Sequence, residues 1–311
     1  MIKFIKRNFQ PFTKNPTDLL VHLFSPKFRA SFTQAKKITQ EVKERNEIED
    51  LNLIREIHCA YSSSILLASF LNSGERIKVY SGHDSVTFGQ AFNVDVLAES
   101  WGDHFIRGFA RKTEVDSTNE QGNFCVERRI FGSGEPFVSA RELGDFNKGL
   151  FDEDVQQYCD SSEQIPSKVY ISGKNFEDKS GNYSTLGLLI QILPGTEKEY
   201  IDEIYEKISQ KSFFKEIHNT DIDEKSIKKL FEDVNDDITY STKEFTFKCD
   251  CTKELVQKFL ESMDKDSLIK LKQDPYQLIN CSFCNNPYEF SRDEIDSFIA
   301  DDLIDLSVRR K

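Results

Sequence analysis

The chain has 311 residues, with 41 Lys and Arg against 53 Asp and Glu, which gives a formal net charge of −12. Its 26 Phe, 10 Tyr and single Trp supply too much apolar surface for a disordered protein. The acidic total argues against a nucleic-acid partner, because phosphate contacts need clustered cations.

No apolar run is long enough to cross a bilayer, since the longest, at 65–71 and 186–193, have the lengths of a core helix and a core strand. The first 14 residues lack the long apolar region of a secretory signal. Seven Cys in a long chain do not fit an extracellular disulfide framework. We therefore expect no membrane partner and a cytoplasmic, reducing environment.

Charge is unevenly distributed along the chain. Residues 1–44 hold nine basic and three acidic residues, whereas residues 195–243 hold eight basic and thirteen acidic ones. The pattern predicts a solvated basic arm over 1–16 and an acidic, helical connector over 195–243.

Between these segments, helices and strands are segregated along the sequence. The segments 18–24 and 28–32 flank Ser25-Pro26 and predict a hairpin. The segregation predicts an α+β domain over 17–194, with a mixed, mostly antiparallel sheet and packed helices. The remaining segments are helices at 36–46 and 51–72 and strands at 76–80, 94–97, 104–109 and 185–193.

The connector contains two helical patterns. Thr196 and Glu199, which follow Pro194-Gly195, have the spacing of a capping box. An apolar stripe then recurs at helical spacing, and such a stripe usually packs against a core. The stripe consists of Tyr200, Ile201, Ile204, Tyr205 and Ile208, and the second helix carries Ile227, Leu230, Phe231 and Val234.

Four cysteines near the C-terminus form two close pairs, Cys249-x-Cys251 and Cys281-x-x-Cys284. Two pairs can supply the four sulfur ligands of one tetrahedral Zn²⁺, so we predict one zinc ion per chain. The segment 244–292 has few large apolar residues, and a unit of this size usually needs a metal to fold. Four unrelated thiols would not be expected to fall in two pairs. Residues 293–311 are expected to be a tail.

One helix is expected between the cysteine pairs. Its apolar pattern over 253–271 consists of Leu255, Phe259, Leu260, Met263, Leu268 and Leu271.

The other cysteines, Cys59, Cys125 and Cys159, are isolated in the sequence and are expected to be small buried side chains. The sequence contains no nucleophile elbow, P-loop or dinucleotide-binding motif. We therefore do not expect an enzyme.

Several segments resemble the 33 kDa heat-shock chaperonin family of redox-regulated holdases. The cysteine pairs, read as Cys249-Asp-Cys251 and Cys281-Ser-Phe-Cys284, resemble the family's zinc switch. The resemblance covers about residues 17–292. The other matching segments are Ser161–Ser167 (SSEQIPS), Leu188–Gly195 (LLIQILPG), Arg107–Ala110 (RGFA) and Leu66–Ser69 (LLAS).

The resemblance implies an ATP-independent chaperone that is inactive while its four cysteines are reduced and bind zinc. Oxidation would form the disulfides Cys249–Cys251 and Cys281–Cys284 and release the metal. The small domain and the connector would then unfold and expose apolar surface, including the stripe at 200–208, to unfolding client proteins. The family reading also implies a monomer when reduced and a homodimer when oxidised.

Two alternatives stay open at this point. The cysteine pairs could form a zinc ribbon that binds nucleic acid or a protein, although Asp250, Asp264, Asp266 and Glu289 make its surroundings acidic. Cys281 and Cys284 could instead be the catalytic pair of a thiol-disulfide oxidoreductase. That activity requires the pair at the start of a helix in a βαβ unit, whereas 287–290 has the pattern of a strand.

Overall fold

A computed structural model describes residues 15–82, 96–110, 123–142, 151–172, 186–211, 221–273 and 277–299. The described residues fall into two compact units, here called the large unit, up to Lys248, and the small unit, from Cys249. The expected basic arm lies outside the described residues except for residues 15 and 16. Within the described part of the chain, no helix is both long enough and apolar enough to span a membrane.

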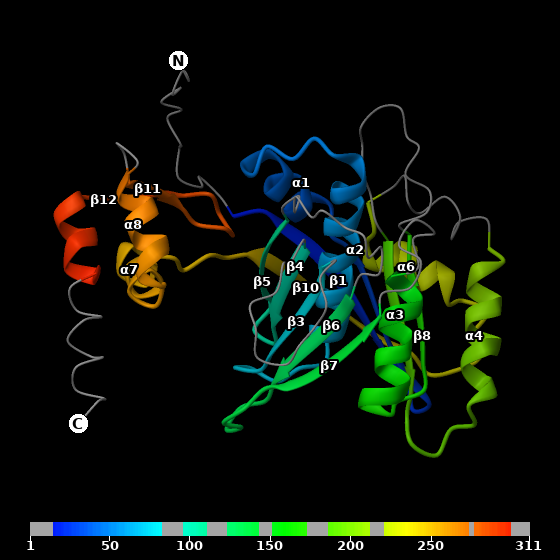
Figure 1. The fold of residues 1–311 in the computed structure, drawn as a ribbon. Coiled ribbons are helices and arrows are strands. Elements are labelled where there is room, and N and C mark those ends of the chain that lie inside the picture. Colours follow the sequence, from blue (N-terminus) through cyan, green and yellow to red (C-terminus); the bar gives the residue numbers. More distant parts are fainter. Residues whose placement is uncertain are drawn as a thin grey trace. The chain divides into compact units, whose positions relative to one another are not determined.

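The large unit is built on one ten-stranded sheet with the order β7-β6-β3-β4-β5-β10-β1-β2-β9-β8 (Figure 1). Neighbouring strands are antiparallel except β5 and β10, which are parallel. The predicted α+β class and the β1–β2 hairpin are therefore confirmed. The strands are β1 (Thr17–Phe24), β2 (Phe28–Gln34), β3 (Arg76–Gly82), β4 (Val96–Trp101), β5 (Phe105–Ala110), β6 (Asn123–Arg129), β7 (Phe137–Glu142), β8 (Ser167–Ile171), β9 (Leu186–Ile192) and β10 (Thr239–Phe247).

The strand β10 crosses the boundary that the sequence predicts between the connector and the zinc-binding segment. We expected a boundary between residues 243 and 244, but β10 continues through it and pairs with β1 along its whole length, from Phe24 opposite Thr239 to Thr17 opposite Thr246. Phe245 and Phe247 are fully buried in this position. Their burial explains why the strand belongs to the large sheet and ends only two residues before Cys249.

Helices cover both faces of the sheet. The helix α2 (Leu51–Ala68) packs on one face, where the Ser69 hydroxyl, just beyond it, donates to Ser31 of β2 (3.1 Å). On the opposite face, α4 (Glu199–Ser209) and α6 (Glu224–Leu230) share one apolar cluster of 17 buried residues with β1, β2 and β9. The remaining helices among the described residues of this unit are α1 (Lys36–Arg45), α3 (Phe151–Tyr158) and the π-helix η2 (Cys159–Glu163).

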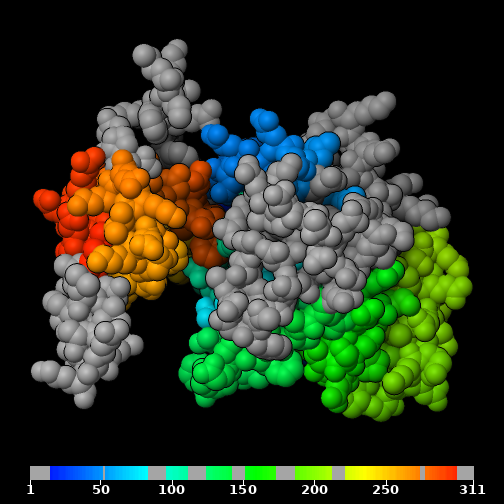
Figure 2. All heavy atoms as spheres, viewed as in Figure 1, coloured from blue at the N-terminus to red at the C-terminus, as the bar shows by residue number. Residues whose placement is uncertain are grey.

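The helices of the expected connector therefore pack as part of the large unit. Phe231, which follows α6, stacks on Phe28 with 6.1 Å between the ring centroids and meets Phe32 edge-on at 5.8 Å. In the space-filling view α4 (yellow-green) lies beside α3 (green) (Figure 2). Lys168 of β8 forms an ion pair with Asp202 of α4 at 2.9 Å.

The predicted capping box at Thr196 is wrong. The helix α4 begins at Glu199 without any side-chain cap on Lys198, and the Thr196 hydroxyl instead donates to the carbonyl of Lys27 (3.1 Å). A capping box does occur at the start of α6, where Asp223 and Ser226 bond to each other's backbone N–H groups. The Thr196 side chain therefore holds the chain against the β1–β2 hairpin rather than starting the helix.

The single helix expected over 253–271 is also wrong, because two helices fill this segment. They are α7 (Lys253–Glu261) and α8 (Lys265–Gln273). The Asp264 carboxylate accepts the backbone N–H of Ser267 (2.9 Å), and this cap starts the second helix.

Part of the expected tail is also ordered differently from the prediction. Residues 292–299 form a helix that buries Ile295 and Phe298 in the small unit.

Two members of the apolar pattern predicted over 253–271, Leu255 and Phe259, are not buried. They are 52% and 60% exposed.

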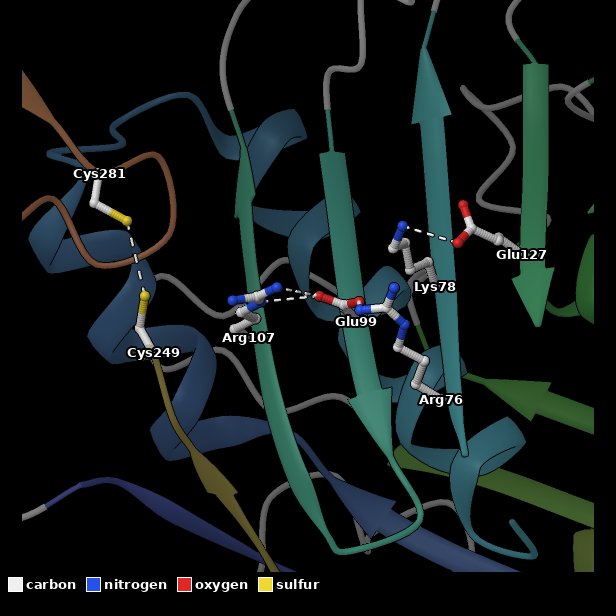
Figure 3. Close-up of polar contacts among 7 residues, drawn as sticks. All are labelled: Arg76, Lys78, Glu99, Arg107, Glu127, Cys249 and Cys281. Atoms are coloured by element: carbon white, nitrogen blue, oxygen red, sulfur yellow. Dashed lines mark hydrogen bonds and ion pairs between the residues drawn. The ribbon is translucent and has the colours of Figure 1, made fainter. Parts of the chain in front are cut away.

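A buried ion cluster joins three central strands (Figure 3). Glu99 of β4 is 1% exposed and lies between Arg76 of β3, at 2.9 Å, and Arg107 of β5, at 2.8 Å. A second pair, Lys78 with Glu127, links β3 to β6 at 2.9 Å. Glu99 lies directly opposite Arg107, and Lys78 directly opposite Glu127, whereas Arg76 reaches Glu99 diagonally. The two directly opposite pairs help to set the register.

Replacing Glu99 by Gln is expected to lower the free energy of unfolding by about 3 kcal/mol, because two partly buried guanidinium groups lose their counter-charge. The matched variant Glu127→Gln, which leaves only one Lys unpaired, is expected to cost about 1 kcal/mol. Urea unfolding followed by circular dichroism measures both. Equal losses in the two variants would contradict the assigned role of Glu99.

Candidate metal centre

The first cysteine pair lies between the end of β10 and the start of α7. Thr252, which directly follows Cys251, caps α7 by accepting the backbone N–H of Leu255 (3.3 Å). Cys251 therefore lies directly before the N-cap residue of α7.

The second pair lies in the turn of a hairpin formed by β11 (Gln277–Asn280) and β12 (Pro287–Phe290). Asn285 adopts a left-handed conformation with φ of 57°, which Asn tolerates better than most residues. Its backbone N–H donates to the carbonyl of Cys281 (2.8 Å), and the N–H of Cys281 donates to the carbonyl of Asn286 (2.9 Å). This tight turn brings the two thiols to one side of the hairpin.

The four predicted ligands converge. Their sulfur atoms all lie within 4.8 Å of one another. The Sγ atoms of Cys249 and Cys281 are 3.7 Å apart (Figure 3), and those of Cys251 and Cys284 are 3.2 Å apart. In a tetrahedral zinc site with Zn–S bonds of about 2.3 Å, sulfur atoms lie about 3.8 Å apart. The donor set and its spacing therefore fit a metal ion of the zinc type.

The thiols interact electrostatically. Hydrogen bonds from the Cys249 and Cys284 thiols lower the pKa of Cys281, and the backbone N–H groups of Phe283 and Cys284 add to this effect. The pKa values of Cys249 and Cys284 are raised, chiefly by the hydrogen bonds through which they share a proton with their neighbours. One thiolate thus forms readily among the four, whereas four adjacent thiolates need a cation to compensate their charge.

Tyr288 is a residue of this site that the sequence analysis did not identify. Its hydroxyl donates to the carbonyl of Cys251 (2.9 Å) and to the Cys251 sulfur (3.0 Å). Burial and this hydrogen bond raise the pKa of Tyr288, so it remains a neutral donor. Hydrogen bonds of this kind orient metal ligands. In the sequence, the only indication of this role for Tyr288 is its position four residues after Cys284.

The small unit has a small apolar core. In the described residues its apolar cluster has five buried members, against 17 in the cluster under α4 and α6. A core of this size contributes little stability, so ligand binding at the cysteines would dominate the folding of this unit. The buried members are Leu260, Leu268, Phe290, Ile295 and Phe298.

The remaining cysteines have a different environment. Cys59, Cys125 and Cys159 are at most 3% exposed, as expected of small core residues. Burial raises the pKa of Cys59 to about 12 and that of Cys125 to about 11, and it also raises that of Cys159. Buried thiols with raised pKa values react slowly with oxidants, because the thiolate is the nucleophile.

Residues 18–291 match the model of the family described as "Hsp33 protein". The chain belongs to the Hsp33 family. A "33 kDa chaperonin" of Agathobacter rectalis is 30% identical over 220 residues, which cover 67% of this chain and 74% of that protein. One from Prochlorococcus marinus strain AS9601 is 36% identical over 268 residues, covering 77% and 84%.

The fold agrees with a solved member of the Hsp33 family. The crystal structure of the 33 kDa chaperonin from Thermotoga maritima superposes with a TM-score of 0.71 at 21% identity, covering 92% of this chain and 99% of that one. The resemblance inferred from the cysteine spacing is thereby confirmed at the level of family and fold.

The reduced protein is expected to carry close to one zinc ion per chain, because four thiols with suitable spacing converge at one point. In the double variant Cys249→Ser, Cys284→Ser, one ligand of each pair is lost and most of the metal should be absent. Elemental analysis of the purified proteins measures this, with Cys125→Ser as a control that retains the metal. Full retention in the double variant would show that the ligands are misassigned.

Proposed function

We propose that this Hsp33 chain is a cytoplasmic, ATP-independent holdase chaperone that oxidation switches on. The observation that carries the proposal is the convergence of Cys249, Cys251, Cys281 and Cys284 in a unit with very little apolar core. Membership of a family whose relatives are named chaperonins supports the chaperone part of the proposal.

In the reduced state, the four thiolates hold one zinc ion, whose binding supplies folding free energy on the order of 10 kcal/mol. Tyr288 keeps Cys251 oriented through its hydroxyl. The protein is inactive and monomeric in this state.

Oxidation removes the ligands. A peroxide accepts two electrons from each pair of thiolates and two protons from solvent and leaves as two water molecules, while an S–S bond forms. The proposed bonds join Cys249 to Cys251 and Cys281 to Cys284, the neighbours in sequence. Disulfide sulfurs carry no thiolate charge for a metal, so the site empties and the small unit loses most of its stability.

The large unit then has to expose apolar surface to unfolded clients. The stripe on α4 supports this step, since Ile201, Ile204 and Ile208 are at most 6% exposed and lie against β2 and β9. The chain connects the two units directly, because β10 packs with α6 and ends two residues before Cys249. Release of α4 and α6 would uncover both their own apolar faces and the sheet, and the exposed surface would also support dimer formation.

Suppression of aggregation tests the proposal. A heat-unfolded model protein should aggregate in the presence of the reduced, zinc-loaded chain and should remain soluble in the presence of the peroxide-treated chain. Light scattering measures the aggregation. Equal activity of the two forms would reject the redox switch, and no activity in either form would reject the holdase.

The oxidoreductase alternative receives less support from the site. Cys281 and Cys284 lie between two strands of a hairpin, not at the start of a helix in a βαβ unit. Catalysis of insulin reduction would nevertheless favour that alternative over the holdase.

Activation should not depend on the three cysteines of the large unit. Their burial and raised pKa values keep them unreactive, so a variant with Ser at positions 59, 125 and 159 should still be switched on by peroxide if it folds. Circular dichroism checks the fold and light scattering the activity. A folded variant that loses zinc normally but stays inactive would place part of the switch in the large unit.

Loosening α4 should activate the chaperone before oxidation. Ile204→Asp places a carboxylate at a position that is 1% exposed and should cost about 3–5 kcal/mol. We expect partial suppression of aggregation in excess reductant, with zinc content unchanged. The control is Lys207→Asp, which introduces the same residue on the exposed side of α4.

Proteolysis rates report whether Ile204→Asp has loosened the helix. A variant with a loosened α4 that remains inactive until it is oxidised would contradict the coupling and place control in the small unit alone.

A further inference from the structure

The segment Ser161–Ser167, part of the family resemblance, has no role in the zinc switch but borders several cavities of the large unit. The π-helix η2 leads into it, and Gln164 then adopts a left-handed conformation with φ of 56°. π-Helical turns and left-handed non-glycine residues occur often at functional sites. The conformation places Glu163 and Ile165 in the wall of one cavity, and Ile165 also in the wall of the next.

These two cavities are adjacent and differ in chemistry. The smaller, of about 170 Å³, contains the charged side chains Arg29, Arg128 and Glu163. The larger, of about 350 Å³, shares Arg29 and Ile165 with it and is otherwise mostly apolar. The rest of its lining is Gln164, Pro166, Ile192, Leu193 and Pro194.

Arg29 is held at the junction of the two cavities. Its Nε donates to Oε1 of Gln191 (2.9 Å), and its guanidinium lies 4.1 Å from the centre of the Phe70 ring. Gln191 is 1% exposed and donates in turn to the Ser167 hydroxyl (3.2 Å), which donates to the carbonyl of Ile165 (2.8 Å). The segment thus fixes the orientation of Arg29 through Gln191.

The terminal nitrogen atoms of Arg29 have no hydrogen-bond partner or carboxylate among the described residues. Arg128 forms ion pairs with two carboxylates, Glu163 at 3.2 Å and Glu75 at 3.9 Å, while its buried Nε has no partner in the described part of the chain. Burial lowers the pKa of Arg29, Glu163 opposes this effect and Arg128 adds to it. Among the charged side chains that line the smaller cavity there are two guanidinium groups and one carboxylate, and the terminal nitrogens of Arg29 are donors that an anion could use.

We propose that these cavities form a binding site for a carboxylate carried on an apolar group. The carboxylate accepts hydrogen bonds from the terminal nitrogens of Arg29 and from Arg128, and the apolar group occupies the larger cavity against Ile165, Pro166 and Leu193. The C-terminal residue of an apolar peptide and a small apolar acid share this chemistry. The site does not depend on the zinc switch, and the test uses only the reduced, zinc-loaded chain.

Calorimetric titration with N-acetyl-leucine is the direct test, with N-acetyl-leucinamide as the matched probe that lacks the charge. The acid should bind, and the amide should bind about tenfold or more weakly, because it lacks the charge-assisted hydrogen bonds. A peptide, acetyl-Ala-Ala-Ala-Leu, distinguishes the sources: binding equal to that of the acid supports a peptide C-terminus, and binding of the single amino acid alone supports a small acid. Equal binding of acid and amide would overturn the proposal.

Variants test the two charges separately. Arg29→Gln should weaken binding of N-acetyl-leucine about tenfold or more, whereas Glu163→Gln should strengthen it, since a competing carboxylate is removed. Arg141→Gln is the control, because Arg141 bonds to Gln157 and Ser161 and does not line either cavity. Thermal unfolding verifies each fold. Should Arg29→Gln fail to fold, the Glu163→Gln titration remains decisive, and unchanged or weaker binding there would also overturn the proposal.

Discussion

The shortage of apolar core in the small unit is the constraint on which the proposed switch depends. Its helices leave Leu255 and Phe259 exposed, and its described cluster buries only five apolar side chains. A unit of this kind cannot offset its chain entropy by burial alone. Under the proposed function, its fold depends on the state of four sulfur atoms, so the formation of two disulfide bonds would be enough to unfold it.

The same chain separates its thiols into two chemical classes by burial. Cys59, Cys125 and Cys159 lie in the core of the large unit, where desolvation raises their pKa values. The four clustered thiols instead receive hydrogen bonds from one another, from backbone N–H groups and from Tyr288. Under the proposed function, an oxidant would therefore react at this one cluster, while the buried thiols of the large unit stay reduced.

Local patterns predicted most elements, and long-range contacts account for what they missed. Apolar patterns located β1 to β5 and β9 but gave no prediction of β6, β7 or β8, and the spacing of four cysteines located the metal centre. The pairing of β10 with β1, more than 200 residues earlier in the chain, has no local signal, so the boundary at residue 243 was misplaced. Thr196 has the spacing of a cap, but a tertiary bond to Lys27 takes its hydroxyl. Tyr288 contributes through a hydrogen bond that only folding creates.

The position of the apolar stripe explains why α4, rather than α2, would be released. Helix α2 is buried around most of its circumference, and even Ser62, Ser63 and Ser64 are fully inaccessible. Helix α4 buries one face only, has no side-chain cap at its start and exposes charged residues on its other side. Elements with few buried contacts open at the lowest free-energy cost. Loss of α4 would thus expose the apolar face of β2 and β9 while α2 still covers the opposite face, so the sheet could remain folded as a surface for clients.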